Sequence, residues 1–255
     1  MARYSNTDWP ERLWVVRHGQ SAGNVAREAA ESGGLKLIDI QSRDADTPLS
    51  DLGKQQSVAL ASWFAASDAT LQPDVFLTSP FVRAQQTAET IAAALAPNGA
   101  ELQPDERLRE KEFGILDRYT KLGITEKFSE LAEQRARVGK FYFRPPGGES
   151  WCDVILRLRS VVEELRLDYA GRRVIIVSHQ VVVNCFRYLL EKMDEQTILD
   201  IDHRGDVPNC GVTEYGFSAT PDGRRFALIR ANFVVPLVEA GAPVTKAPDR
   251  PAGPK

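Results

Sequence analysis

Cysteine is scarce in this sequence, and long apolar runs are absent. The 255 residues include three cysteines, Cys152, Cys185 and Cys210, which are too few and too scattered for a disulfide framework. We therefore expect a reducing compartment, most simply the cytoplasm. No apolar run reaches the roughly 18 residues of a membrane-spanning helix, and the first residues lack the apolar stretch of a secretory signal. These absences predict a protein with no membrane partner.

An excess of either charge is also missing. The 32 Lys and Arg residues against 35 Asp and Glu leave a net charge of −3, which argues against general nucleic-acid binding. An anionic small molecule is still a suitable ligand, because local arginines bind one against a mildly negative background. Hydrophobic residues at 43% and charged residues at 26% are the proportions of an ordinary globular chain, so collagenous and wholly disordered classes are excluded.

Short apolar runs alternate along the chain with helical patterns. The predicted strands are residues 13–16, 75–77, 174–177, 212–217 and 225–229. The first three are continuous apolar runs, typical of strands buried on both faces of a sheet. The last two flank Pro221-Asp222-Gly223, a turn signal that predicts an antiparallel pair.

Signals for helix starts fall between these strands. Ser79 and Pro80 have the pattern of an N-cap followed by proline at the first helical position. Ser150 and Asp153 form a capping-box-like start of a second helix. Residues 180–192 predict a third helix that is mostly buried. Strands that alternate with helices predict a three-layer α/β/α domain with a mainly parallel sheet.

One domain and a tail account for the whole chain. We assign residues 1–240 to the domain. Within it, residues 115–145 are charged and weakly amphipathic, and we interpret them as a helical insertion over the top of the sheet. Residues 241–255 hold four prolines and almost nothing to bury, so we expect them to form a disordered tail.

Polar residues follow the three clearest strands at the point where each strand ends. Arg17 and His18 follow the first strand, and His179 follows the third. Arg83 comes within one helical turn of the end of the second. Because ligands bind at the carboxyl ends of strands in open α/β sheets, we expect these four side chains to line one site.

Two arginines beside two histidines suit a phosphoryl group better than a metal ion. Guanidinium groups repel a cation, whereas they give bidentate, charge-assisted hydrogen bonds to phosphate oxygens. The same positive charge disfavours imidazolium, so a histidine keeps its lone pair near neutral pH and can attack phosphorus. The residues therefore predict phosphoryl transfer through a phosphohistidine that water removes, with no metal and no other cofactor.

The leaving oxygen needs a proton donor near this pocket. We choose Glu110, since the like charge of a bound phosphate dianion would raise the pKa of that carboxyl group and keep it protonated. Glu112 and Asp117 lie close to it in the sequence, and spacing alone leaves both open as the acid.

Several blocks in a fixed order resemble the histidine phosphatase superfamily, also called the phosphoglycerate mutase-like family. The first block is Arg17-His18-Gly19 with the polar residues up to Asn24. The others are residues 47–53, 79–88, 108–110, 146–150, 177–179 and 207–209. One Arg-His-Gly triplet is weak evidence, whereas blocks in family order over about residues 12–230 are strong.

The resemblance implies a fold and a set of roles. His18 is similar to the family's phosphorylated nucleophile, and Glu110 to its general acid. The residues that match its phosphate pocket are Arg17, Arg83 and His179. The implied fold is a single α/β/α domain with a helical subdomain over the active site. The implied partner is a phosphorylated small-molecule substrate, and a homodimer is a common state among such proteins.

Three residues near the pocket are further candidates for contact with the substrate. Asn24 matches a family position that often contacts phosphate or substrate, whereas capping of a helix over residues 21–25 explains Ser21 and Asn24 equally well. Gln180 stands where many members carry glycine. A side chain at that position narrows the pocket or contacts the substrate.

Two departures from the family bear on the reaction. The stretch 24–47 is longer than in compact bacterial phosphatases, and it either borders the site or pairs subunits. The glycolytic mutases carry a basic, proline-rich stretch that holds the phosphoglycerate carboxylate, and residues 115–145 lack it. We therefore favour a phosphomonoester hydrolase of the phosphatase branch. A cofactor-dependent phosphoglycerate-type mutase and a non-catalytic module that binds a phosphorylated ligand are the alternatives.

Overall fold

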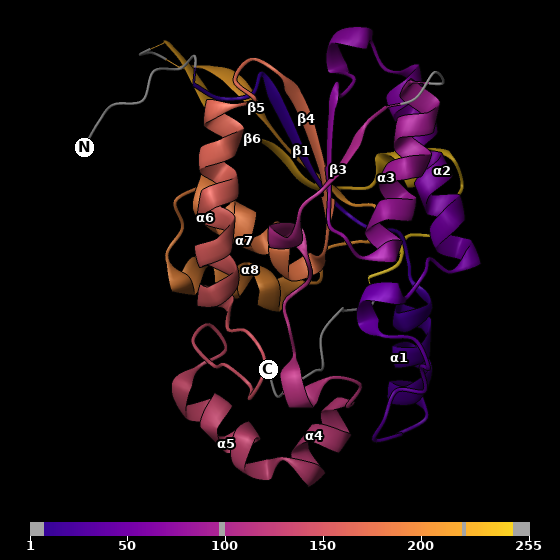
Figure 1. Cartoon of the computed structure of the whole chain (residues 1–255), viewed down its shortest axis with the longest axis vertical. Coiled ribbons are helices and arrows are strands. Elements are labelled where there is room, and N and C mark those ends of the chain that lie inside the picture. The colour runs from indigo at the N-terminus through magenta and orange to yellow at the C-terminus, as the bar shows by residue number, and fades with distance from the viewer. Residues whose placement is uncertain (1–7, 97–99, 221–222, 247–255) are drawn as a thin grey trace.

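A six-stranded mixed sheet forms the centre of the molecule (Figure 1). The computed structural model describes residues 8–96, 100–220 and 223–246. The strands are β1 (Arg12–Arg17), β2 (Val75–Thr78), β3 (Leu102–Pro104), β4 (Arg173–Ser178), β5 (Val212–Thr220) and β6 (Gly223–Phe233), in the order β3-β2-β4-β1-β5-β6. β1 to β4 run parallel, and β5 is antiparallel to both β1 and β6, which confirms the mainly parallel sheet and its five predicted strands. The short edge strand β3 was not predicted.

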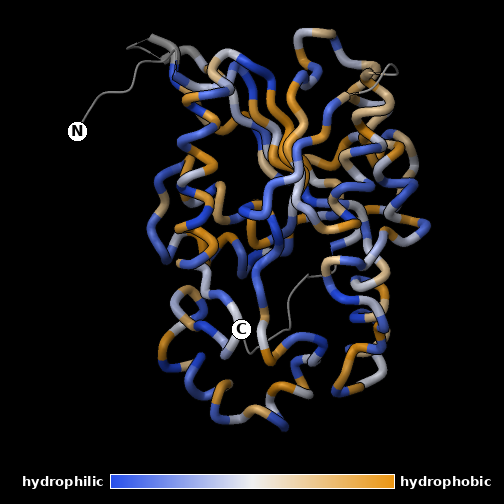
Figure 2. The backbone as a smooth tube through the Cα atoms, in the orientation of Figure 1, coloured by the Kyte–Doolittle hydropathy of each residue, from blue (hydrophilic) through white to orange (hydrophobic). Residues whose placement is uncertain are grey.

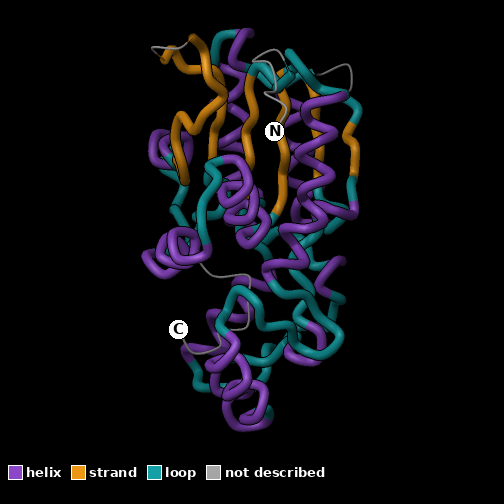
Figure 3. The backbone as a smooth tube through the Cα atoms, turned by 90° about the vertical axis from the view of Figure 1, so that its left-hand side faces the viewer, coloured by secondary structure: helices purple, strands orange, loops and turns teal. Residues whose placement is uncertain are grey.

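Helices cover both faces of the sheet. They are α1 (Ala22–Ser32), α2 (Asp51–Ala66), α3 (Val82–Leu95), α4 (Lys121–Lys127), α5 (Ser129–Val138), α6 (Trp151–Leu167), α7 (Gln180–Leu190), α8 (Glu195–Arg204) and α9 (Val235–Glu239). Figure 1 shows α2 and α3 on one face, with α6, α7 and α8 on the other. The three-layer prediction is therefore confirmed. Helices α4 and α5 of the predicted insertion lie beyond the carboxyl ends of the strands (Figure 3).

Alternate residues of β1 face the two helical layers. Leu13 and Val15 are buried with residues of α6 and α7, whereas Trp14 and Val16 are buried with residues of α2 and α3. A strand buried on both sides has a continuous apolar run, and Figure 2 shows such strands at the centre of the molecule. None of the described helices is long and apolar enough to cross a membrane.

One of the two predicted helix starts is confirmed, and the other is wrong. The Ser150 hydroxyl accepts from the Asp153 backbone N–H at 3.2 Å, which completes a capping box at the start of α6. By contrast, α3 begins at Val82 with Phe81 in the cap position, not at Ser79. The Ser79 hydroxyl accepts from the Phe81 N–H at 3.2 Å and also contacts a histidine described below.

The described part of the predicted tail is held on the domain. The Asn209 backbone N–H donates to the Thr245 carbonyl at 2.9 Å, and the Gln56 side-chain amide donates to the Pro243 carbonyl at 2.8 Å. These contacts place residues 243–245 against helix α2 and the loop that precedes β5. Residues 247–255, together with Pro221 and Asp222 of the predicted turn, lie outside the described residues.

Candidate active site

The pairing of β1 with β4 brings the two strand-end histidines together. Parallel register places Arg17 beside Ser178, the residues just before His18 and His179. The His18 backbone N–H donates to the Ser178 carbonyl at 2.9 Å, and the two imidazole centroids lie 5.1 Å apart. Both rings are fully buried. The two histidines therefore meet at the carboxyl edge, as the strand endings predict.

Hydrogen bonds fix the tautomer of His18. Its Nδ1 lies 2.6 Å from the Gly19 carbonyl oxygen, which can only accept, so Nδ1 carries the ring proton. The lone pair is then on Nε2, and the Arg83 Nε–H donates to it at 3.2 Å. A Cβ at position 19 would lie 2.5 Å from the Gly53 carbonyl oxygen, so this close approach requires glycine. The imidazole is thus held in its neutral form, with the lone pair on Nε2.

Both predicted arginines are buried in the same region. Arg17 donates through Nη1 to the Val207 carbonyl at 2.5 Å. Arg83 donates through Nη1 to the Asp44 carbonyl at 2.6 Å and through Nη2 to the Asp44 carboxylate at 3.2 Å. The Arg83 guanidinium therefore has its Nε on His18 and its other nitrogens on Asp44. Arginine forks held in this way are well placed to bind phosphoryl oxygens.

His179 is held from the second parallel strand. Its Nε2 lies 2.8 Å from the Ser79 hydroxyl, and its ring centroid is 5.1 Å from that of Phe81. Ser79 follows β2 directly. Side chains that directly follow three parallel strands, β1, β2 and β4, therefore meet in one place, and the hydroxyl that we predicted as a helix cap contacts His179 there.

Of the three candidate acids, Glu110 is the buried one. It is 1% exposed, whereas Glu112 and Asp117 lie exposed at the surface. The segment that carries Glu110 is tied to the end of β4, because the Ser178 hydroxyl donates to the Leu108 carbonyl at 2.7 Å. Burial beside the carboxyl edge favours Glu110 as the acid over its two neighbours.

Lys111 adds a buried cation that the sequence pattern does not single out. Burial lowers its pKa to about 8, against the raising effect of Glu110 and Glu149. The Nζ lies 4.7 Å from the Phe113 ring centroid. The one sequence feature that points to Lys111 is its position directly after Glu110.

The remaining candidates make contacts within the protein. Ser21 and Asn24 form the capping box of α1, with the Asn24 N–H donating to the Ser21 hydroxyl at 3.1 Å. Both also line a cavity of about 50 Å³ together with Asp44 and Arg83. The Gln180 amide donates to Asp206 at 2.6 Å. The capping interpretation of Ser21 and Asn24 is therefore confirmed, while substrate contact by these three residues stays a prediction.

Two further residues near the pocket were missed by sequence reasoning. The Asn209 side-chain amide donates to the His18 carbonyl at 3.1 Å. Asn209 ends one of the blocks that carry the family resemblance, so its position was noted without a role. Asp44, the partner of Arg83, lies in a stretch with no periodic pattern, and no sequence signal marked it.

Positive charge dominates the chemistry of this arrangement. The buried Arg83 guanidinium contacts the neutral His18 imidazole, and the Arg17 guanidinium is buried as well, in a setting of low dielectric where their attraction for an anion is strong. Among the described residues, no three His, Cys, Asp or Glu side chains are grouped to hold a metal ion. The site is suited to a phosphoryl dianion.

Comparison with known proteins gives a consistent result. Residues 13–232 match the family described as the histidine phosphatase superfamily (branch 1). The 2,3-bisphosphoglycerate-dependent phosphoglycerate mutase of Allorhizobium ampelinum is 32% identical over 198 residues, which cover 77% of this chain and 87% of that protein. The probable phosphoglycerate mutase GpmB of Photorhabdus laumondii is 31% identical over 216 residues, covering 82% and 86%.

A solved structure extends the likeness to a phosphatase. Mycobacterial glucosyl-3-phosphoglycerate phosphatase in complex with VO3 matches with a TM-score of 0.67 and 26% identity. The match covers 87% of this chain and 98% of that chain. The comparisons thus include both mutases and phosphatases, whose common chemistry is phosphoryl transfer.

Proposed function

Since the chain belongs to the histidine phosphatase superfamily (branch 1), we propose that it hydrolyses small phosphomonoesters without a metal, through a phosphohistidine on His18. One observation carries the proposal. The ring proton of His18 is held on Nδ1 by Gly19, and the Nε2 lone pair meets the Nε–H of Arg83, a phosphate-binding group. Phosphoryl transfer requires this combination of an unprotonated ring nitrogen and fixed positive charge.

The first half-reaction transfers the phosphoryl group to the enzyme. His18 Nε2 attacks phosphorus, and a new N–P bond forms as the bond to the leaving oxygen breaks. Glu110 gives its proton to that oxygen, so the leaving group departs as a neutral alcohol. Arg17, Arg83 and His179 stabilise the charge on the three remaining phosphoryl oxygens.

The second half-reaction returns the enzyme to its starting state. Glu110, now a carboxylate, takes a proton from a water molecule whose oxygen attacks phosphorus. The N–P bond breaks, and its electron pair returns to the His18 imidazole. Inorganic phosphate leaves with Glu110 protonated again. A mutase would differ at this step, because it must exclude water and return the phosphoryl group to an acceptor.

Hydrolysis of 4-nitrophenyl phosphate in the presence of EDTA tests the proposal. We compare the wild type with His18→Ala and with His203→Ala, since His203 is an exposed histidine on α8 and provides a matched control. We expect turnover that survives EDTA, is unchanged in His203→Ala, and falls by roughly 1,000-fold or more in His18→Ala. Quenching in alkali should show phosphohistidine at position 18.

The other outcomes separate the alternatives. A long-lived phosphoenzyme with negligible hydrolysis would replace our proposal with the mutase. Loss of wild-type turnover in EDTA would contradict the metal-free mechanism. Neither turnover nor labelling on a panel of alkyl and aryl phosphates would indicate a non-catalytic module that binds a phosphorylated ligand.

A further inference from the structure

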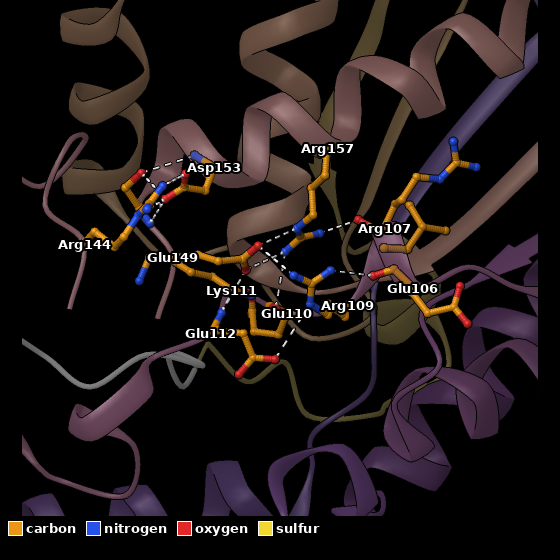
Figure 4. Close-up of polar contacts among 12 residues, drawn as sticks. Glu106, Arg107, Arg109, Glu110, Lys111, Glu112, Arg144, Glu149, Asp153 and Arg157 are labelled. Atoms are coloured by element: carbon orange, nitrogen blue, oxygen red, sulfur yellow. Dashed lines mark hydrogen bonds and ion pairs between the residues drawn. The ribbon is translucent and has the colours of Figure 1, made fainter. Parts of the chain in front are cut away.

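The ion pair of Arg157 and Glu149 forms hydrogen bonds to the segment that carries Glu110. Arg157 lies on the second turn of α6, and Glu149 lies just before that helix. Arg157 donates through Nε and Nη2 to the two carboxylate oxygens of Glu149, at 3.0 and 3.1 Å (Figure 4). The two side chains are 11% and 13% exposed. This bidentate, largely buried geometry is the strongest kind of arginine–carboxylate contact.

The remaining hydrogen bonds of Arg157 go to the backbone around the acid. Its Nη1 donates to the Arg107 carbonyl, and its Nη2 also donates to the carbonyl of Glu110 itself at 3.3 Å. Figure 4 shows Arg157 between Glu149 and this segment. The Arg157 guanidinium therefore contacts the backbone of Glu110 and also the backbone three residues before it.

Glu149 holds the same segment through its carboxylate and its backbone. The carboxylate accepts from Arg109 Nη2 at 2.8 Å and from the Glu112 backbone N–H at 3.0 Å. Its own N–H donates to the Glu112 carbonyl at 2.9 Å. The pair thus contacts residues on both sides of Glu110.

These contacts matter because the segment has no regular structure of its own. Residues 109–113 belong to no helix and no strand, so no ladder of backbone hydrogen bonds fixes them. Burial alone would raise the pKa of Glu149, but the hydrogen bonds and charge of Arg157, with the Glu112 N–H and Arg109, outweigh it and hold the pKa below its ordinary value. The Glu149 carboxylate therefore stays ionised at neutral pH, and its ion pair with Arg157 persists.

We propose that Glu149 and Arg157 are positioning residues, which hold Glu110 at the distance that proton donation to the leaving group requires. The inference rests on the proposed function. A general acid loses much of its effect when it is misplaced by about 1 Å. Breaking the pair should therefore impair proton donation selectively, rather than the attack of His18 or the binding of phosphate.

The leaving group provides a selective readout. Dinitrophenolate is a good leaving group that departs without a proton, whereas phenolate needs one. We compare kcat/KM for 2,4-dinitrophenyl phosphate and phenyl phosphate in Glu149→Gln, Arg157→Gln and Glu110→Gln. The ratio of the two values on one sample does not depend on the fraction of folded enzyme, so a loss of stability cannot mimic the effect.

We expect Glu149→Gln and Arg157→Gln to lower kcat/KM for phenyl phosphate by about 10- to 100-fold, and for dinitrophenyl phosphate by less than about 3-fold. Glu110→Gln should show the same pattern with a larger loss. The double variant of Glu149 and Arg157 should lose little more than either single variant, because residues that act as a unit are not additive.

Glu164→Gln is the matched control. Glu164 lies on the same helix and pairs with Arg107 of the same segment, yet it does not contact Glu110. Its substitution should leave the substrate ratio within about 2-fold of the wild type. A selective loss in Glu164→Gln, or an equal loss on both substrates in Glu149→Gln and Arg157→Gln, would overturn the positioning role.

Failure of the proposed function would look different. If Glu110→Gln showed no selective loss, Glu110 would not be the acid, and the pair would have no acid to position. If the wild type hydrolysed neither ester, hydrolysis itself would be wrong. The positioning role alone fails when Glu110→Gln is selective and the variants of the pair are not.

Discussion

Lys111 places a cation in a poorly solvated position next to Glu110, the acid that we propose. Burial lowers its pKa to about 8 from the ordinary 10.5, against the opposing effect of Glu110 and Glu149. Because the pKa is lower in the folded chain than in the unfolded one, the charged amine destabilises the fold. The loss of folding free energy caused by this charge is greatest below pH 8, and it disappears as the pH rises from about 8 to 10.5.

Lys111→Met should therefore stabilise the protein at neutral pH. We expect the free energy of unfolding to rise at pH 7 by up to about 3 kcal/mol, and the difference from the wild type to shrink towards pH 10. Urea denaturation at both pH values measures it, with Lys54→Met, at an exposed lysine of α2, as the control. A less stable Lys111→Met at pH 7 would show that the amine is compensated in the fold.

Three of the four residues predicted from the strand endings, His18, Arg83 and His179, contact one another, for a simple physical reason. Parallel pairing aligns the carboxyl ends of β1, β2 and β4, so residues just past each strand share one edge. The apolar runs that precede His18 and His179 are enough to predict two buried parallel strands, and hence that the two histidines lie at the same edge of the sheet. Asp44 and Lys111 could not be found in this way, because their places depend on segments without periodic structure.

Among the elements, the segment between α1 and α2 makes its own contribution to the pocket. Residues 33–47 contain one short 3-10 turn, Asp44–Asp46, and the Ile38 N–H donates to the Arg118 carbonyl at 2.8 Å. Arg118 has φ +62°, in the left-handed region that favours glycine, so its backbone is held there by its surroundings. The segment is thereby fixed where Asp44 contacts Arg83.

Asp44→Asn should strengthen the binding of phosphate. The Asp44 carboxylate lies 3.1 Å from Arg83 Nη1 and partly neutralises the guanidinium that we assign to the phosphoryl group. Asparagine keeps an acceptor oxygen, and the contact of Arg83 with the backbone carbonyl of residue 44 is unaffected. We expect the inhibition constant of inorganic phosphate to fall by about 3- to 10-fold at low salt.

A matched control separates this effect from general surface charge. Asp46→Asn removes the same charge two residues away, where the carboxylate pairs with exposed Arg43. Its inhibition constant should stay close to that of the wild type. Weaker inhibition by phosphate in Asp44→Asn would mean that the carboxylate mainly orients Arg83.

The two predicted helix starts show that a local sequence pattern does not always fix the residue at which a helix begins. Ser150 caps α6 as predicted, because its hydroxyl faces the first amides of the helix and the Asp153 carboxylate completes the box. Ser79 has a different signal, a serine followed by proline. Its hydroxyl accepts from the Phe81 N–H at 3.2 Å and also lies 2.8 Å from Nε2 of His179, a residue 100 positions away. The local hydrogen bond therefore forms, but the helix itself begins only at Val82.

At the scale of the whole molecule, two segments meet beyond the carboxyl edge of the sheet. We call residues 33–47 and 114–143 together the cap. The Thr120 hydroxyl donates to the Leu35 carbonyl at 2.6 Å, and the Thr120 N–H donates to the Lys36 carbonyl at 3.1 Å. The cap has a small core of its own, which consists of Leu116, Ile124 and Phe143.

The cap and the sheet differ greatly in buried apolar surface. Helix α5 contains no buried residue, whereas β1 and β4 lie between two clusters that contain most of the buried hydrophobic side chains of the described chain. Segments with few buried contacts open locally, at a free energy below that of global unfolding. The protein should therefore loosen first in the cap, next to the pocket and without unfolding the strands that hold His18.

Gly123→Ala tests that division between cap and sheet. A Cβ at residue 123 would lie 2.0 Å from the Lys36 carbonyl oxygen, so the substitution forces the two segments of the cap apart. Gly205→Ala is the control, since nothing lies within 4 Å of a Cβ there. In native-state hydrogen exchange, Gly123→Ala should lower the protection of residues 35–38 and 119–124 by about 10-fold or more, with β1 and β4 unchanged. An equal loss of protection in the strands would show that cap and sheet unfold as one unit.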